Sequence, residues 1–339
     1  MPKKARKKVN LALQGGGAHG AYTWGVLDYL LEDDRLNIDG ITGTSAGAMN
    51  AVALASGFHE NGADGARQTL EDFWKEVSRH AFLSPIKRSP IDIAIGQWSL
   101  DFSPSYLTFD LLSRFASPYE FNPLNVNPLK DVVEKVVNFD NVRACDGIKL
   151  FIAATNVHTG KIKIFQGDEI QVDSVMASAC LPTLFHAVEI DGEAYWDGGF
   201  MGNPPLYPLF YNTETPDILL VQINPIERRD TPRSAREILN RLNEITFNST
   251  LLREMRIVDF VVRMLEEGKL STDDYMKVKM HRISAEELKP LQASSKSNAE
   301  WAFLEELKGI GRRAAESWIN THYDAIGNQS TINLREEFS

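Results

Sequence analysis

The sequence predicts an α/β protein with a parallel sheet covered by helices on both faces. A short apolar run at residues 9–14 leads through a glycine cluster into a helical pattern with apolar residues at Trp24, Leu27 and Leu31. The same order recurs at residues 38–44, an apolar run that leads into a helix of small residues at 46–56. Two successive β–α units are typical of parallel sheets, because the helix returns the chain to the same end of the sheet.

Composition limits the class of protein. The chain has 339 residues, of which 43% are hydrophobic, so it can bury a large core. Its net charge of -10 argues against general nucleic-acid binding, which needs a positive surface to displace phosphate counterions. Residues 1–8 are an exception, since they hold a basic run that we expect to be a disordered tail and that could contact anionic lipid: Lys3, Lys4, Arg6, Lys7 and Lys8.

Targeting signals and cysteines indicate the compartment. The apolar stretch after the basic run breaks at once into glycines, and no window approaches the length of a membrane-spanning helix. The two cysteines, Cys145 and Cys180, give neither a disulfide framework nor zinc spacing. We therefore expect a cytoplasmic protein, with peripheral membrane contact as an addition.

The region at about 81–129 differs in composition from the rest of the chain, with prolines interleaved among aromatic residues. An insertion of this length is rarely a plain connector. It could form a lid over a ligand pocket, or it could be a packed excursion that covers the sheet edge. Both interpretations stay open from the sequence.

Regular structure resumes after the insertion. We expect a helix at 129–137, a strand at 150–155, a hairpin into 162–165 and a strand at 218–223, which complete a catalytic domain over residues 9–225. Residues 226–339 should form a mainly helical C-terminal extension, with helices at 234–267 and 298–323 and a strand at 276–283. These helices could pack on the core, lie on a membrane or join two subunits of a homo-oligomer.

The segment Gly43-Thr44-Ser45-Ala46-Gly47 is a G-x-S-x-G placed where the predicted strand turns into a helix. Gly43 and Gly47 leave room for the sterically tight turn that presents a nucleophile. The turn sets Ser45 at a helix N-terminus, where free N–H groups favour developing negative charge. The strand before it and the helix after it indicate a nucleophilic serine.

The first glycine motif in chain order follows the first predicted strand: Gly15, Gly16, Gly17, Ala18, His19 and Gly20. Its G-x-G-x-x-G form is found in dinucleotide-binding turns, but no acidic residue closes a second strand as such a site requires. We expect an oxyanion hole instead, with N–H groups near Gly16 and Gly17 aimed at the carbonyl that Ser45 attacks. His19 could order this loop through a hydrogen bond or contact an anionic head group.

A third motif, Trp196-Asp197-Gly198-Gly199, offers a base for the serine. An aspartate followed by two glycines is also an ordinary turn, and Asp-Gly pairs occur at four other places in the chain. The motif alone therefore does not assign Asp197 a role.

The three motifs together, in this order, with residues 177–182 (ASACLP) before the last and Asn203-Pro204-Pro205 after it, resemble the patatin-like phospholipase family over residues 9–224. The resemblance implies a three-layer α/β/α sandwich with a mostly parallel central sheet, and a Ser-Asp dyad without a catalytic histidine. Ser45 would be the nucleophile, Asp197 the base that returns the proton to the leaving alcohol, and residues 15–20 the oxyanion hole. The expected substrate is a lipid or acyl ester. Many members carry arginine or lysine where His19 stands here, which weakens the case for head-group attraction at this position.

Other functions stay open. A Ser-His-Asp hydrolase would need His281 or His322, the histidines that follow Asp197. A catalytically silent lipid-binding or scaffold protein could keep the same fold, and the first glycine motif leaves nucleotide binding as an alternative. The histidines are scattered and show no metal-ligand spacing, so we expect neither a metal nor another cofactor.

Overall fold

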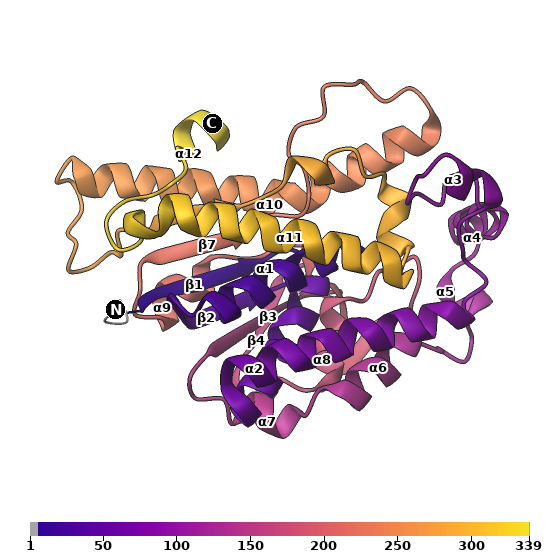
Figure 1. The fold of residues 1–339 in the computed structure, drawn as a ribbon, viewed down its shortest axis with the longest axis horizontal. Coiled ribbons are helices and arrows are strands. Elements are labelled where there is room, and N and C mark those ends of the chain that lie inside the picture. The colour runs from indigo at the N-terminus through magenta and orange to yellow at the C-terminus, as the bar shows by residue number, and fades with distance from the viewer. Residues whose placement is uncertain (1–5, 339) are drawn as a thin grey trace.

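The computed structural model describes residues 6–338 and contains one mixed, eight-stranded sheet with helices on both faces (Figure 1). The strand order is β5-β6-β3-β2-β1-β7-β8, and β4 also pairs with β3. The strands from β3 to β8 along this order are parallel, whereas β4, β5 and β6 are antiparallel to their neighbours. This confirms the predicted α/β fold. The strands are β1 (Lys7–Leu13), β2 (Leu36–Gly43), β3 (Lys149–Asn156), β4 (Ile162–Phe165), β5 (Val188–Ile190), β6 (Glu193–Asp197), β7 (Asp217–Val221) and β8 (Lys279–Ile283).

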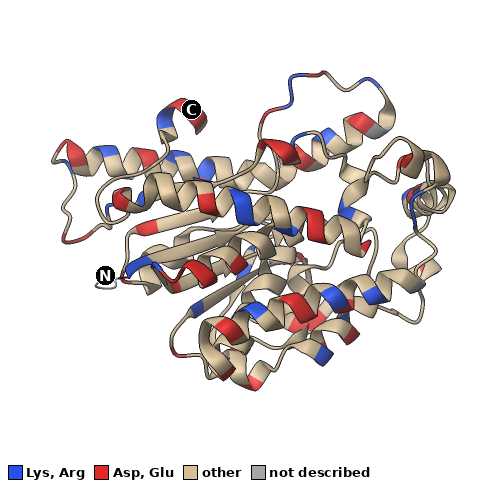
Figure 2. Cartoon of the chain, in the orientation of Figure 1, with Lys and Arg blue, Asp and Glu red and all other residues tan. Residues whose placement is uncertain are grey.

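Alternate residues of the parallel strands enter two separate hydrophobic cores. In β7, Leu219 and Val221 belong to one core, and Ile218 and Leu220 to the other. The first core is covered by α1 (Gly20–Asp33), α2 (Ala46–Leu83), α6 (Pro128–Val136), α8 (Val172–Ser178) and α11 (Trp301–His322). The second is covered by α9 (Tyr207–Asn212), α10 (Ala235–Glu266) and α12 (Leu334–Phe338). Figure 2 shows charged residues on the outer helices and loops, and those of β1 and β7 lie at the first residues of each strand.

The insertion contains helices that begin at its prolines. Proline suits the first turn of a helix, because its missing N–H would have no partner there. In each case a serine or asparagine precedes the proline at the N-cap: α3 (Pro90–Ala94) after Ser89, α4 (Pro104–Phe115) after Ser103, α5 (Pro118–Phe121) after Ser117, and α6 after Asn127. The short α7 (Phe139–Arg143) follows. Four of the six prolines of the insertion therefore start helices.

The sequence missed one hairpin of the sheet, formed by β5 and β6. Its turn is the Asp191-Gly192 pair, and both residues have positive φ, 52° and 80°. Two consecutive positive φ values are the signature of a tight hairpin turn. The helix expected at 46–56 is also longer than expected, since α2 continues to Leu83 across a break at Asn61 and Gly62.

The chain after residue 225 belongs to the same packed body. β8 pairs in parallel with β7, and α11 lies along α1. The boundary at 225 and the pairing of subunits through the C-terminal helices stay predictions. Among residues 6–338, no helix is both long and apolar enough to cross a bilayer.

The N-terminal basic run is only partly described. Residues 1–5 of the expected tail lie outside the described residues. Lys7 and Lys8 are part of β1, and the Lys8 ammonium lies 2.7 Å from the Glu214 carboxylate. The expectation of a disordered tail through residue 8 is therefore wrong for these two residues, because strand pairing with β2 fixes them.

The contact between α1 and α11 depends on two glycines. A Cβ on Gly25 would lie 2.0 Å from the Lys308 carbonyl oxygen, and a Cβ on Gly311 would lie 2.1 Å from that of Tyr22. Neither position leaves room for a methyl group, because both obstructing atoms are backbone. The two helices therefore approach closely along this seam.

Gly311→Ala is expected to lower the free energy of unfolding by about 1–3 kcal/mol, since the helices must separate to admit the methyl group. Gly309→Ala, two residues earlier in the same helix, is the matched control. Its Cβ would approach only the flexible end of Arg313, at 3.4 Å. Alanine there should raise stability by up to about 1 kcal/mol through helix propensity. Urea unfolding followed by circular dichroism measures both, and equal effects of the two changes would contradict the packing account.

Candidate active site

Ser45 lies in a strained turn between β2 and α2. Its φ of 54° and ψ of -120° are conformations that side-chain-bearing residues rarely adopt. The flanking glycines are required by space: a Cβ on Gly43 would lie 2.8 Å from the Gly47 carbonyl carbon, and one on Gly47 would lie 2.2 Å from the Leu13 carbonyl oxygen. The turn therefore has the form expected of a nucleophile elbow.

The pairing of β3 brings Asp197 to this turn. Ile152 of β3 pairs with Gly43 on one edge and Phe165 on the other, and Ala154 pairs with Asp197 and Lys163 in the same way. Since Phe165 and Lys163 both belong to β4, β2 and β6 must share the opposite edge of β3. Their carboxyl ends point toward each other and are separated by two residues of β3. This arrangement places Asp197 beside the residues that follow Gly43.

Asp197 is a buried carboxylate in contact with Ser45. Asp197 is 1% exposed, and its carboxylate accepts a hydrogen bond of 2.7 Å from the Gly199 N–H. Burial raises the pKa of Asp197 to about 7, against the lowering effect of the Gly199 N–H and of the neighbouring Ser45 hydroxyl. A Cβ on Gly199 would lie 2.1 Å from the Phe247 ring, so only glycine lets α10 close over the carboxylate here.

The first glycine motif lies against the serine. A Cβ on Gly15 would be 2.8 Å from the Ser45 Cβ, which explains the glycine. The Gly15 N–H donates to the Asn203 side chain at 2.7 Å, and its carbonyl accepts from the Asn224 side chain at 2.7 Å. Among residues 6–338, no protein acceptor pairs with the N–H of Gly16 or Gly17. These two donors are available to an external oxygen.

The short helix η5 (Ala293–Ser297) contacts His19 and the rest of the glycine motif at residues 15–20. The His19 Nε2 lies 2.8 Å from the Ser295 hydroxyl, which itself donates to the Gln292 carbonyl, so neutral His19 is the donor. Burial, together with the nearby charges of Lys296 and Arg228, lowers the pKa of His19 to about 3. Gly17 has φ of +59°, and a Cβ there would lie 2.5 Å from the Lys296 carbonyl oxygen. His19 therefore has the loop-ordering hydrogen bond that was one of its two interpretations. Ala18 and Gly20 complete η1 (Gly17–His19) and the start of α1.

Three residues support the site without having been assigned a role from sequence. The Ser178 hydroxyl accepts the Ser45 N–H at 2.9 Å, the Cys180 carbonyl accepts the Asp197 N–H at 2.8 Å, and Asn203 holds Gly15. All three lie in the ASACLP and Asn-Pro-Pro segments that contributed to the family resemblance. The segments were visible signals, but their contacts depend on the tertiary fold. Gly198 is confined too, since a Cβ there would lie 2.2 Å from the Ala153 carbonyl oxygen.

The histidines of the triad alternative have other partners. His281 is fully buried between β7 and β8, where its Nε2 lies 3.0 Å from Asp217 and its Nδ1 lies 3.2 Å from the Thr331 hydroxyl. Asp217 is the first residue of β7, at the end of the sheet opposite to Ser45. His322 ends α11 and packs against Trp318. The structure does not bring either histidine to the serine.

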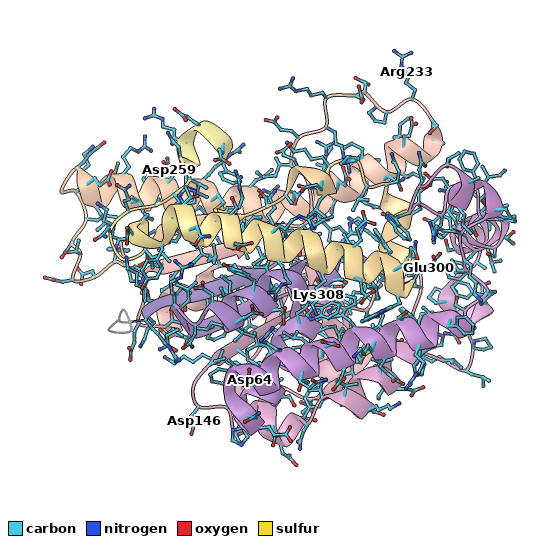
Figure 3. The ribbon with its side chains drawn as sticks, in the orientation of Figure 1. Asp64, Asp146, Arg233, Asp259, Glu300 and Lys308 are labelled. Atoms are coloured by element: carbon cyan, nitrogen blue, oxygen red, sulfur yellow. The ribbon has the colours of Figure 1, made fainter. Side chains whose placement is uncertain are left out.

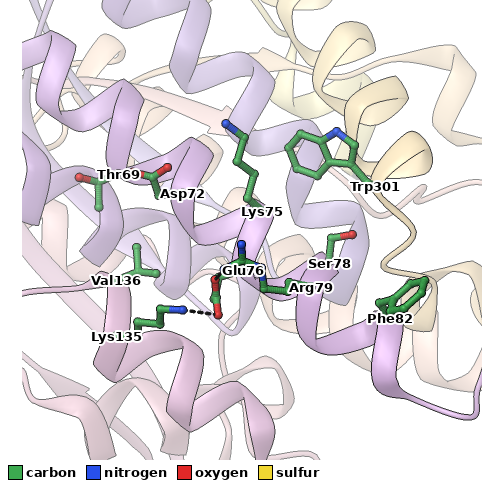
Figure 4. A pocket seen from close by; sticks show the side chains of 10 residues that line it. All are labelled: Thr69, Asp72, Lys75, Glu76, Ser78, Arg79, Phe82, Lys135, Val136 and Trp301. Carbon is green, nitrogen blue, oxygen red and sulfur yellow. Dashed lines mark hydrogen bonds and ion pairs between the residues drawn. The ribbon is translucent and has the colours of Figure 1, made fainter.

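Two other features bear on ligands. A recess of about 830 Å³ lies between α2, α6 and the start of α11, lined by residues such as Glu76, Lys135 and Trp301 (Figure 4). Neither Ser45 nor Asp197 lines it. Among the described residues, no group of three or more His, Cys, Asp or Glu side chains is arranged to hold a metal ion. The independence from metals stays a prediction.

Comparison with known proteins identifies the family. The model of the patatin-like phospholipase family matches residues 11–210. The chain belongs to this family. Among solved structures it is similar to VipD from Legionella pneumophila, with 14% identity, 98% of this chain and 73% of that chain covered, and a TM-score of 0.43. ExoU from Pseudomonas aeruginosa, solved in complex with SpcU, matches with 14% identity and a TM-score of 0.31, over 93% of this chain and 53% of that chain. This chain thus spans about half the length of ExoU.

Asp197→Asn is expected to stabilise the protein at pH 8 and not at pH 5. The folded-state pKa of about 7 lies above the unfolded value of 3.8, so stability falls as pH rises between these values and the ionised carboxylate is buried at a cost above pH 7. Asparagine removes that cost, on the order of 2–4 kcal/mol at pH 8, and keeps an acceptor for the Gly199 N–H.

Thermal unfolding of both proteins at the two pH values measures this. The pH 5 comparison is the internal control, because Asp197 is then protonated in the folded state. A variant that is equally or less stable than the parent at pH 8 would contradict the raised pKa.

Proposed function

We propose that the protein is a serine lipid acyl hydrolase that cleaves carboxylic esters through a Ser45-Asp197 dyad and an acyl-enzyme. Membership of the patatin-like phospholipase family supports lipid hydrolysis. The observation that carries the dyad is the sheet register that places the Ser45 turn beside a buried carboxylate, whose pKa is raised to about 7.

The raised pKa suits Asp197 to both halves of the reaction. An aspartate with an ordinary pKa is a weak base toward a serine hydroxyl, whereas one that titrates near neutral pH can accept and return a proton. Asp197 takes the hydroxyl proton as the Ser45 Oγ forms a bond to the ester carbonyl carbon. It then gives that proton to the leaving alcohol as the ester C–O bond breaks.

The glycine motif supports stabilisation of the intermediate. The carbonyl oxygen becomes negatively charged when Ser45 adds to it, and the N–H groups of Gly16 and Gly17 are free to donate to it. Water then attacks the acyl-enzyme: Asp197 accepts a proton from the water, and the Ser45 oxygen recovers a proton as the fatty acid leaves. Residues 15–20 would thus act as the oxyanion hole.

The other functions have less support. A triad would need a histidine at Ser45, but His281 is paired with Asp217 near the far end of β7. A dinucleotide site would need the motif to face a phosphate, but Gly15 packs against Ser45. A silent lipid-binding protein would have no use for a strained serine joined to a desolvated carboxylate. Metals and cofactors play no part in the proposed reaction.

Ser45→Ala and Asp197→Asn are each expected to lower the hydrolysis of p-nitrophenyl esters by about a thousandfold or more, because the nucleophile and its base act as a unit. The matched control is His322→Gln, which should keep wild-type activity. His281→Asn tests the second histidine, with circular dichroism to confirm that the buried change leaves the fold intact.

Graded acyl chain lengths in the same assay measure the size of the acyl site. The dyad would be refuted by full activity in Asp197→Asn, or by loss of activity in a folded histidine variant. Full activity in excess EDTA is the expected result for a reaction without metal.

A further inference from the structure

The insertion presents an apolar surface around α4. We define the insertion's apolar surface as the exposed large apolar side chains of residues 91–126, among them Ile93, Leu111, Leu112, Phe115 and Leu124. Phe115 and Leu124 are 83% and 85% exposed. None of the 12 residues of α4, all of them described, is buried. A helix of this length is marginal without a packing partner, so its apolar side chains call for one.

The insertion is anchored on both sides of the Ser45-Asp197 pair. On one side, the Leu100 N–H donates to Ser294 at 3.0 Å, so the insertion contacts η5, the segment that holds the oxyanion loop. The Arg88 guanidinium also pairs with Glu300, at 2.6 Å, where α11 begins (Figure 3).

The second anchor lies beside Asp197. The Tyr119 ring of α5 stacks on His186 with centroids 4.0 Å apart, and the His186 carbonyl accepts from the Cys180 thiol at 3.0 Å. Cys180 is the residue whose carbonyl holds the Asp197 N–H. α4 lies in the chain between these two anchors, and each anchor contacts a segment that touches the glycine motif or Asp197.

The small number of charged side chains in the insertion, and their local pairing, favour lipid over a protein partner. Residues 91–126 hold five charged side chains, and four have local roles: Asp92 is buried, Glu120 caps α5, and Asp110 pairs with Arg114. The fifth, Asp101, accepts from Ser294. The apolar side chains are also spread over several short elements, whereas a peptide partner is usually met by one groove or helix face. A deformable lipid surface accommodates such a spread.

The start of α10 extends the same end of the molecule. Ile238, Leu242 and Ile245 are exposed at helical spacing, and the loop before α10 carries Arg229 and Arg233. In Figure 3, Arg233 points outward from this loop, which lies above α3 and α4 in the view of Figure 1. Basic residues beside an apolar surface favour a lipid layer with anionic head groups.

We propose that the insertion's apolar surface docks the enzyme on an anionic lipid layer, with the Ser45 site facing that layer. This inference rests on the proposed function for the identity of the substrate, but docking itself needs no hydrolysis. The Ser45→Ala protein therefore allows docking to be measured on intact lipid, and failure of the ester assay would leave the binding result unaffected.

The test is cosedimentation of full-length Ser45→Ala protein with vesicles of phosphatidylcholine and phosphatidylglycerol. Adding Leu111→Asp and Phe115→Asp should lower the vesicle-bound partition coefficient by about tenfold or more, since two apolar side chains no longer enter the lipid. The matched control is Tyr211→Asp on α9, a side chain 81% exposed at the opposite end of the molecule in Figure 1. It should bind like the parent.

If thermal unfolding shows that the double change destabilises the fold, Leu124→Asp, in a loop, serves as a second variant. Equal vesicle binding by the parent, the variants of the insertion's apolar surface and the Tyr211→Asp control would overturn the proposal. Light scattering without vesicles tests for a dimer. If the parent is a dimer and the changes in the insertion's apolar surface make it a monomer, the surface binds a second copy of the chain and the proposal is overturned.

Discussion

The rest of the site depends on one feature of the sheet, the meeting of β2 and β6 along a single edge of β3. β2 runs parallel to β3 and ends at Gly43, and β6 runs antiparallel to β3 and ends at Asp197. Their carboxyl ends therefore approach each other, so that Asp197 at the end of β6 lies beside the Ser45 turn that follows β2. In an all-parallel sheet, the carboxyl ends of these two strands would lie at the same edge of the sheet on different strands, and they would not face each other.

This arrangement carries two local costs that the surrounding fold must sustain. Ser45 holds an unfavourable backbone conformation, and Asp197 is ionised only against the effect of burial. Contacts from distant parts of the chain maintain both: Ser178 accepts the Ser45 N–H, α10 closes over Gly199, and η5 contacts His19 in the glycine motif. The carboxylate and the strained serine are therefore positioned by the whole body, including the C-terminal region.

The sequence predicted the first strands, the helices after them and the Ser45 turn better than the contacts that complete the site. β1, β2 and the helices after them follow from local apolar runs and glycines, and the Ser45 turn follows from Gly43 and Gly47. The β5-β6 hairpin was missed because Asp191-Gly192 was one of five Asp-Gly pairs, with no local feature to distinguish it. The support of His19 by Ser295 and of Gly15 by Asn203 spans 276 and 188 residues, and no local pattern encodes such contacts. The role expected for Asp197 came from the family resemblance. Its position beside Ser45 became visible only in the register of the sheet.

The measurement that tests the central claim most directly is covalent labelling with a fluorophosphonate, followed by peptide mass spectrometry. The account predicts one adduct, on Ser45, formed rapidly in the wild-type protein and much more slowly in Asp197→Asn, because the serine then lacks its base. Labelling at another residue, or labelling of Ser45 at an unchanged rate in Asp197→Asn, would contradict a nucleophile activated by this carboxylate.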